Sequence, residues 1–120
     1  WREDLETKPE TVESWPTVVA EDDQKILGFA QLNPSQVPWD LVSLWIAPES
    51  MRKGIGKALL RHVQGIAASA KQTQITIDAD PNALAFYVAC GAVVVGHQAA
   101  PIAAQPQRTR PQLHLATNAA

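Results

Sequence analysis

Two glycines flanked by three cations form the segment of this chain with the clearest chemical potential. Gly54 and Gly56 are separated by one residue, and Arg52, Lys53 and Lys57 lie beside them. Glycine lacks a side chain, so backbone N–H groups in such a segment can approach a ligand closely. A helix is expected directly afterwards, and its unpaired N-terminal N–H groups and positive dipole end favour phosphate. The segment therefore predicts a turn that binds pyrophosphate.

Two well-known phosphate motifs do not fit this segment. A P-loop requires Gly-x-x-x-x-Gly-Lys-Ser/Thr, but Lys57 is followed by Ala58 and the first glycine position holds Met51. A dinucleotide-binding turn requires a third small residue, and that position holds Leu59. The predicted turn is therefore of another kind.

The elements that position this turn can be read from apolar spacing and turn residues. Apolar residues recur every three or four positions from Ile55 to Ala70, which predicts a helix with one buried face. Asp80-Pro81 predicts the start of a second helix over residues 82–90, which Gly91 would end. The other apolar and β-branched segments predict strands at 17–21, 25–32, 40–47, 74–79, 92–95 and 112–117.

The order of these elements predicts an α/β domain with a mixed sheet. Hairpin-forming strands come first, joined by a turn at 22–24. The strand–helix–strand unit that follows implies a parallel central pair in a mostly antiparallel sheet. Residues 1–13 predict the end of a surface helix or a loose lead-in, and residues 99–111 an irregular loop. We expect residues 1–120 to form a single domain.

Composition limits the classes of function. Of the 120 residues 46% are hydrophobic, and ten basic against twelve acidic residues give a net charge of −2, which argues against a general nucleic-acid binder. Cys90 is the only cysteine, so neither an intrachain disulfide nor a clustered-cysteine metal site is expected. No apolar run approaches the roughly 20 residues of a membrane helix, and no secretory signal is visible. We expect a cytoplasmic protein that does not bind membranes.

Three segments together resemble the GNAT superfamily of acyl-CoA N-acyltransferases. Its acyl-CoA turn follows the pattern Gln/Arg-x-x-Gly-x-Gly/Ala, and residues 51–56 match it except that Met51 occupies the Gln/Arg position. Residues 80–87, which read Asp-Pro-Asn-Ala-Leu-Ala-Phe-Tyr, resemble the second block, and residues 26–30 resemble the preceding hairpin strand. The likeness extends over residues 17–96. The strand and helices that usually open the family fold are largely absent, so we expect an N-terminally short GNAT-like domain.

The resemblance implies that the chain binds acetyl-CoA as its acyl donor. Backbone N–H groups of the glycine turn would hold the pyrophosphate, and the end of the preceding strand would pair with the pantetheine arm. Tyr87 resembles the general acid that protonates the CoA thiolate, and it is the expected catalytic residue. The expected cofactor-binding residues are Trp45, Ile46, Met51, Arg52, Lys53, Gly54, Ile55, Gly56, Lys57 and Asn82.

The activity implied by the resemblance is N-acetyl transfer to a primary amine of a small molecule or peptide, by direct attack on the thioester. The alternative is a catalytically weak acyl-CoA-binding sensor or interaction module. The identity of the acceptor and the formation of a homodimer stay open.

Several polar residues have competing interpretations. The general base is unassigned, with Asp40 and Asp78 as candidates. Arg108 and Arg110 could clamp a carboxylate or phosphate of the acceptor, or they could belong to a solvated loop. Cys90 is expected to pack at the end of the second helix, since it lies in an apolar segment without a histidine partner.

Overall fold

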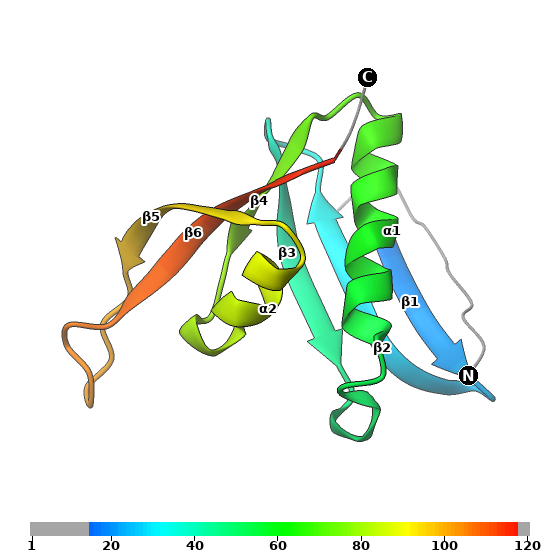
Figure 1. Ribbon diagram of the computed structural model, residues 1–120, viewed down its shortest axis with the longest axis horizontal. Coiled ribbons are helices and arrows are strands. Elements are labelled where there is room, and N and C mark those ends of the chain that lie inside the picture. The colour runs from blue at the N-terminus through cyan, green and yellow to red at the C-terminus, as the bar shows by residue number, and fades with distance from the viewer. Residues whose placement is uncertain (1–14, 118–120) are drawn as a thin grey trace.

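The computed structural model describes residues 15–117, which form a six-stranded sheet with two α-helices (Figure 1). The lead-in expected at residues 1–13 lies outside this range. The strands are β1 Thr17–Asp22, β2 Lys25–Asn33, β3 Trp39–Ile46, β4 Gln74–Asp78, β5 Val93–Ala99 and β6 Thr109–Ala116. The helices are α1 Ile55–Ser69 and α2 Leu84–Ala89, and the short 3-10 helices are η1 Pro48–Ser50 and η2 Pro81–Ala83.

The sheet has the strand order β1-β2-β3-β4-β6-β5. Among the described strands only β3 and β4 are parallel, because α1 carries the chain from the end of β3 back to the start of β4. The other neighbouring pairs are antiparallel. This arrangement confirms the predicted mixed α/β fold with a parallel central pair.

The feature of the sheet that matters most for function is the separation of β3 from β4. The two strands pair only at their beginnings, through Trp39 with Ile75, Asp40 with Thr76 and Leu41 with Ile77. Beyond these pairs β3 continues to Ile46, whereas β4 ends at Asp78, and the strands diverge in Figure 1. The edge of β3 over residues 42–46 therefore faces an opening instead of a neighbouring strand.

Helix α1 fixes the position of this opening by packing across one face of β1 to β4. Its buried side chains lie on one side of the helix, as the apolar spacing predicted. These residues are Ile55, Leu59, Leu60, Val63 and Ala67. Complete burial of one large aliphatic side chain contributes about 1.5–3 kcal/mol, so this contact holds the N-terminus of α1 firmly beside the end of β3.

The expected irregular loop at 99–111 is shorter than predicted. β5 runs to Ala99 and β6 begins at Thr109, so the connection covers residues 100–108 and Arg110 lies on a strand. The side chains of β5 are mostly exposed, and a strand without a buried face has no apolar alternation to reveal its length. The hairpin of β5 and β6 projects from the rest of the sheet in Figure 1.

The second helix also differs in detail from its prediction. Residues 81–83 form the 3-10 helix η2, and the α-helix proper begins at Leu84. Asp80 accepts a hydrogen bond from the backbone N–H of Asn82 at 2.8 Å, as expected of a helix-capping aspartate. Gly91 has a φ of 102°, which confirms the predicted left-handed residue at the end of the helix.

No helix in residues 15–117 is long and apolar enough to cross a membrane.

Candidate active site

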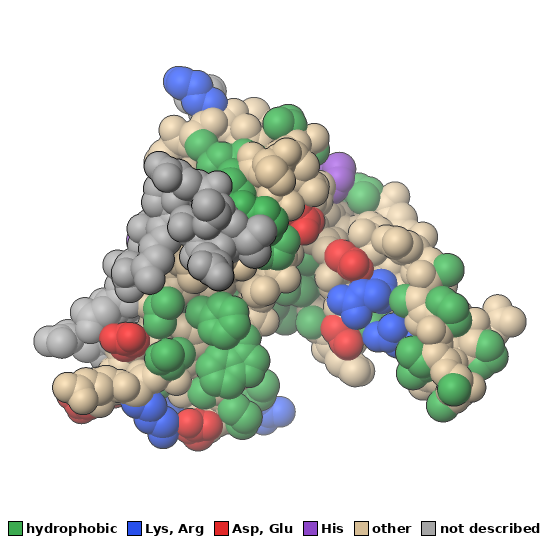
Figure 2. Space-filling model, turned by 180° about the vertical axis from the view of Figure 1, so that it is seen from behind, with side chains coloured by type: hydrophobic (Ala, Val, Ile, Leu, Met, Phe, Trp, Pro, Cys, Tyr) green, Lys and Arg blue, Asp and Glu red, His purple; other side chains and the backbone are tan. Residues whose placement is uncertain are grey.

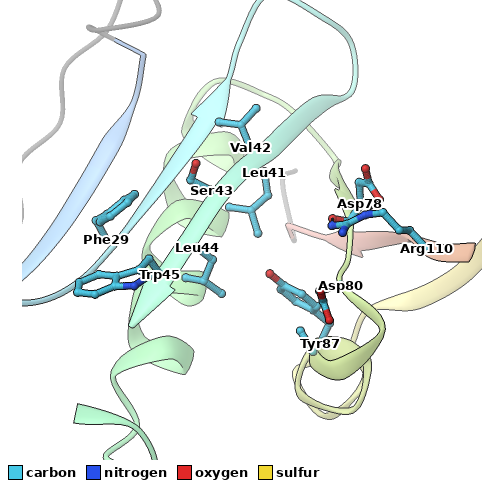
Figure 3. Close-up of a pocket in the computed structure, with 11 residues that line it drawn as sticks. Phe29, Leu41, Val42, Ser43, Leu44, Trp45, Asp78, Asp80, Tyr87 and Arg110 are labelled. Atoms are coloured by element: carbon cyan, nitrogen blue, oxygen red, sulfur yellow. Dashed lines mark hydrogen bonds and ion pairs between the residues drawn. The ribbon is translucent and has the colours of Figure 1, made fainter. Parts of the chain in front are cut away.

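A pocket of about 340 Å³ occupies the opening between β3 and β4 (Figure 3). Seen from behind the sheet, the molecule is hollowed between two lobes, with apolar side chains on one side and charged side chains on the other (Figure 2). The pocket is lined by Phe29, Leu41, Val42, Ser43, Leu44, Trp45, Asp78, Asp80, Ala83, Tyr87 and Arg110. It thus joins the end of β3, the end of β4, α2 and the start of β6 in one site.

The apolar wall of the pocket depends on a close approach of β2 to β3. Phe29 and Trp45 face each other across the two strands, with ring centroids 5.8 Å apart. Next to them, a Cβ atom at Gly28 would lie 2.6 Å from the Trp45 carbonyl oxygen, so only glycine fits there. Trp45 keeps 44% of its surface exposed, which leaves an aromatic face at the mouth of the pocket.

Tyr87 projects from α2 into the pocket, and its hydroxyl points toward Leu44 of β3 in Figure 3. The side chain is 8% exposed. Within residues 15–117 the hydroxyl has no hydrogen-bond partner, so it is available to a ligand. Burial is the main cause that raises the pKa of Tyr87, with a further contribution from Cys90, while Arg110 opposes the shift. The phenol therefore stays protonated at neutral pH and can donate a proton.

The glycine turn presents a row of free backbone donors at the start of α1. Gly54 is the N-cap with a left-handed φ of 79°, and no side chain of residues 15–117 caps the helix. Arg52 also has a positive φ, of 66°. The first backbone hydrogen bond of the helix runs from Ala58 N–H to the Gly54 oxygen at 3.0 Å, and the N–H groups of residues 52–57 make none within the described range. These donors are suited to an anion.

Two of the predicted cofactor residues have backbone donors that are already used. Met51 donates its N–H to the Pro48 oxygen at 3.3 Å, so only its side chain, 58% exposed, is open to a ligand. Asn82 donates its N–H to Asp80 and does not line the pocket. Trp45 lines the pocket directly, and Ile46 follows it at the end of β3.

The charged wall is built from ion pairs between β6 and the end of β4. Arg110 donates Nε–H to Asp78 Oδ1 at 2.9 Å, and Gln112 donates to the same oxygen at 2.8 Å. Burial acts to raise the pKa of Asp78, but these two hydrogen bonds outweigh it and hold the pKa below its usual range. Arg108 lies 3.5 Å from Asp80. Each arginine is therefore paired with its own aspartate, although both remain partly exposed.

The remaining candidates lie away from reactive positions. Asp40 accepts a hydrogen bond from the Thr76 hydroxyl at 2.6 Å and does not line the pocket. Cys90 is partly buried against the core, in agreement with a packing role. In the described part of the chain no group of three or more His, Cys, Asp or Glu side chains is arranged to hold a metal ion.

Comparison with known protein families identifies the family to which this fold belongs. Residues 13–91 match the family model described as the acetyltransferase (GNAT) domain, which is more than half of the chain. The chain belongs to this family. This match confirms the family assignment made from the sequence, and the matched residues include most of those that line the pocket between β3 and β4.

Individual GNAT proteins are similar over different shares of this chain. The peptidyl-lysine N-acetyltransferase YiaC of Escherichia coli strain K12 is 41% identical over 46 residues, which are 38% of this chain and 30% of that enzyme. The ribosomal-protein-S18-alanine N-acetyltransferase of Escherichia coli has a TM-score of 0.77 at 17% identity, over 92% of this chain and 74% of that one. An acetyltransferase of Bacillus anthracis str. Ames was solved in complex with acetyl coenzyme A. It has a TM-score of 0.76 at 18% identity, over 84% of this chain and 61% of that one.

The sequence patterns missed two parts of the pocket. Phe29 could have been found from the hairpin register, because it pairs directly with Trp45 in the sheet. The ion pair of Asp78 with Arg110 joins residues 32 positions apart in the sequence, and the underestimated length of β6 concealed it. Phe29 lies within the segment 26–30 that resembles the family, but strand pairing brings both parts to the pocket.

Proposed function

We propose that this chain transfers an acetyl group from acetyl-CoA to a primary amine. The observation that carries this proposal is the free Tyr87 hydroxyl in the pocket between the diverging strands, beside a helix N-terminus with unused N–H donors. A proton donor and a phosphate-binding turn on either side of an open strand edge suit a ligand with an extended arm and a reactive end. Acetyl-CoA has this form.

The donor would bind along β3 and across the start of α1. The N–H groups of residues 52–57 would hold the pyrophosphate, assisted by the charges of Arg52, Lys53 and Lys57. The pantetheine arm would hydrogen-bond to the open edge of β3 around Trp45 and Ile46, as an added strand does. Asn82 and the exposed Met51 side chain would also contact the cofactor.

The proposed chemistry is direct transfer without a covalent enzyme intermediate. The neutral amine attacks the thioester carbonyl carbon, and a backbone N–H on the edge of β3 stabilises the developing oxyanion. When the tetrahedral intermediate collapses, the carbon–sulfur bond breaks and Tyr87 donates its proton to the leaving thiolate. The low pKa of Asp78 makes this carboxylate a weak base, so loss of the amine proton to water is more consistent with the site.

The proposal is tested by mass spectrometry of reactions that contain acetyl-CoA and a panel of small amines and peptides. An acetylated product that carries the label of [¹³C]acetyl-CoA is the expected result. CoA binding without any acetylated product would favour the acyl-CoA-binding sensor instead. Absence of CoA binding would exclude both functions. A cytoplasmic location and a small-molecule or peptide acceptor are parts of the same proposal.

A further inference from the structure

Arg110 is the only cationic side chain among the pocket-lining residues of the described chain. Its Nε–H bonds to Asp78 Oδ1 at 2.9 Å, and its Nη2 bonds to the Asp78 backbone oxygen at 3.1 Å. A guanidinium has five N–H donors. The other three, two on Nη1 and one on Nη2, have no partner within residues 15–117. One edge of the guanidinium is therefore held by the protein and the other is free.

Asp78 acts as the holder of this guanidinium. Gln112 donates a second hydrogen bond to Asp78 Oδ1 at 2.8 Å and also reaches the Arg110 backbone oxygen at 3.3 Å. These contacts fix both members of the ion pair on adjacent strands. The Arg110 side chain of the pair is 31% exposed, so the guanidinium is partly desolvated yet still accessible from the pocket.

The charges around Arg110 do not exclude an anion. Asp78 is paired with Arg110 itself, and Asp80, the other acid in the pocket, is paired with Arg108 and with the N–H of Asn82. Each carboxylate thus has its own positive partner. The free edge of a guanidinium fits a carboxylate in a planar, two-point geometry.

The pocket has room for a small group of the second substrate beside the donor. Its volume of about 340 Å³ is near the lower end of ordinary ligand sites, about 300–1,000 Å³, and it must also receive the acetyl end of the donor. The side of β3 that faces Arg110 across the pocket is apolar, with Leu41 and Leu44. A short acceptor with an anionic group on one side fits these walls.

We infer that Arg110 is a carboxylate-binding residue of the acceptor site, and that the acceptor is a small amine that carries a carboxylate, such as an amino acid. This inference rests on the proposed N-acetyl transfer. It assigns Arg110 to recognition of the acceptor and Asp78 to positioning Arg110. Neither residue takes a proton from the amine.

Matched acceptor pairs that differ only in the carboxylate test this inference. Suitable pairs are L-phenylalanine with phenethylamine, L-lysine with cadaverine, and L-tyrosine with tyramine. We expect kcat/KM to favour the carboxylate member by about 10- to 100-fold, as for a hydrogen bond to a charged group. We expect Arg110→Gln to remove this preference while the KM for acetyl-CoA is unchanged. Arg61→Gln, the same charge change at an exposed site on α1, should retain it.

Arg110→Lys separates the charge from the geometry, since lysine keeps the positive charge without the planar edge. This variant should fold normally and lose most of the preference for the carboxylate member of each pair. Equal turnover of both members of each pair by the wild type, or an unchanged preference in Arg110→Gln, would overturn the inference.

A binding measurement separates this inference from the proposed function. Titration of the CoA complex with L-phenylalanine should shift the ¹⁵N–¹H signals of the Arg110 Nη groups, and phenethylamine should not. One possible result is that CoA binds and this shift is present, but no amine is acetylated. The transfer proposal then fails while the carboxylate site stands. If acetylation occurs but the shift is absent or equal for both amines, the carboxylate site fails and the transferase function stands.

Discussion

Gly56 in the first turn of α1 packs against the ring of Phe86 in α2. A Cβ atom at position 56 would lie 3.2 Å from Phe86 Cζ, which is tighter than ordinary van der Waals contact. Phe86 in turn lies edge-on to Tyr87, with ring centroids 5.3 Å apart. Phe86 therefore lies between the proposed phosphate-binding turn and the proposed proton donor, in contact with both. Gly56 has a packing role in addition to its predicted role in cofactor binding.

Gly56→Asp should weaken CoA binding strongly, because it adds bulk against Phe86 and a negative charge at the proposed pyrophosphate position. We expect the dissociation constant from calorimetry to rise by about 100-fold or more, as for loss of charged hydrogen bonds and added like-charge repulsion. Gly65→Asp is the matched control, because Gly65 lies on the same helix with no atom within 4 Å of an added Cβ. Equal CoA affinities for the two variants would contradict the assigned phosphate site.

Tyr87→Phe should slow the chemical step without weakening donor binding. Loss of a general acid typically costs about 100-fold or more in kcat, and the KM for acetyl-CoA should stay within about twofold since the ring remains. The hydroxyl has no protein partner in residues 15–117, so thermal unfolding should show a stability change below about 0.5 kcal/mol. Full turnover by Tyr87→Phe at saturating substrates would show that another group protonates the thiolate.

The raised pKa of Tyr87 predicts a difference in alkaline stability. The usual tyrosine pKa is 10.0 and the folded protein raises it, so the unfolded chain loses this proton first as the pH rises. The stability contributed by the neutral phenol is therefore complete below pH 10 and is lost as the pH rises further. In urea unfolding between pH 8 and 11, the wild type should lose stability relative to Tyr87→Phe above pH 10. A difference that is constant across this range would contradict the shift.

Gly28→Ala should disturb the apolar wall of the pocket. The new methyl group would lie 2.6 Å from the Trp45 carbonyl oxygen. Because this oxygen belongs to the backbone, the strand itself would have to shift, and we expect a loss of about 1–3 kcal/mol in the free energy of unfolding. The KM for acetyl-CoA should also rise, since the displaced segment of β3 is the proposed pantetheine edge. Gly96→Ala on β5 is the control, with no atom within 4 Å of the added Cβ, and should stay within about 0.5 kcal/mol of the wild type. Similar stabilities for the two variants would rule out the close approach.

Local patterns were sufficient to predict most of the fold. The apolar spacing after Gly54 predicted α1, and Asp80 and Gly91 marked the ends of the second helical segment, because capping acts through neighbouring residues. The parallel pairing of β3 with β4 followed from the length of the crossover. The sequence pattern predicts too short a strand for the exposed β5, since the length of β5 is fixed by pairing with β6 and not by a buried face.

The site was predictable only where it lies within a motif. The turn at residues 51–57 and Tyr87 are features of contiguous segments that match the family pattern. The charged wall instead depends on β6 crossing beside β4, with Gln112 opposite Asp78. Such a long-range register cannot be obtained from spacing along the chain, so the partners of Arg110 became visible only in the folded protein.

A structure of the protein with bound CoA tests the central claim most directly. We expect the pyrophosphate within hydrogen-bond distance of the N–H groups of residues 52–57, with the pantetheine arm along residues 42–46 and the sulfur within reach of the Tyr87 hydroxyl. A pyrophosphate bound elsewhere, or an arm that does not enter the opening between β3 and β4, would contradict it.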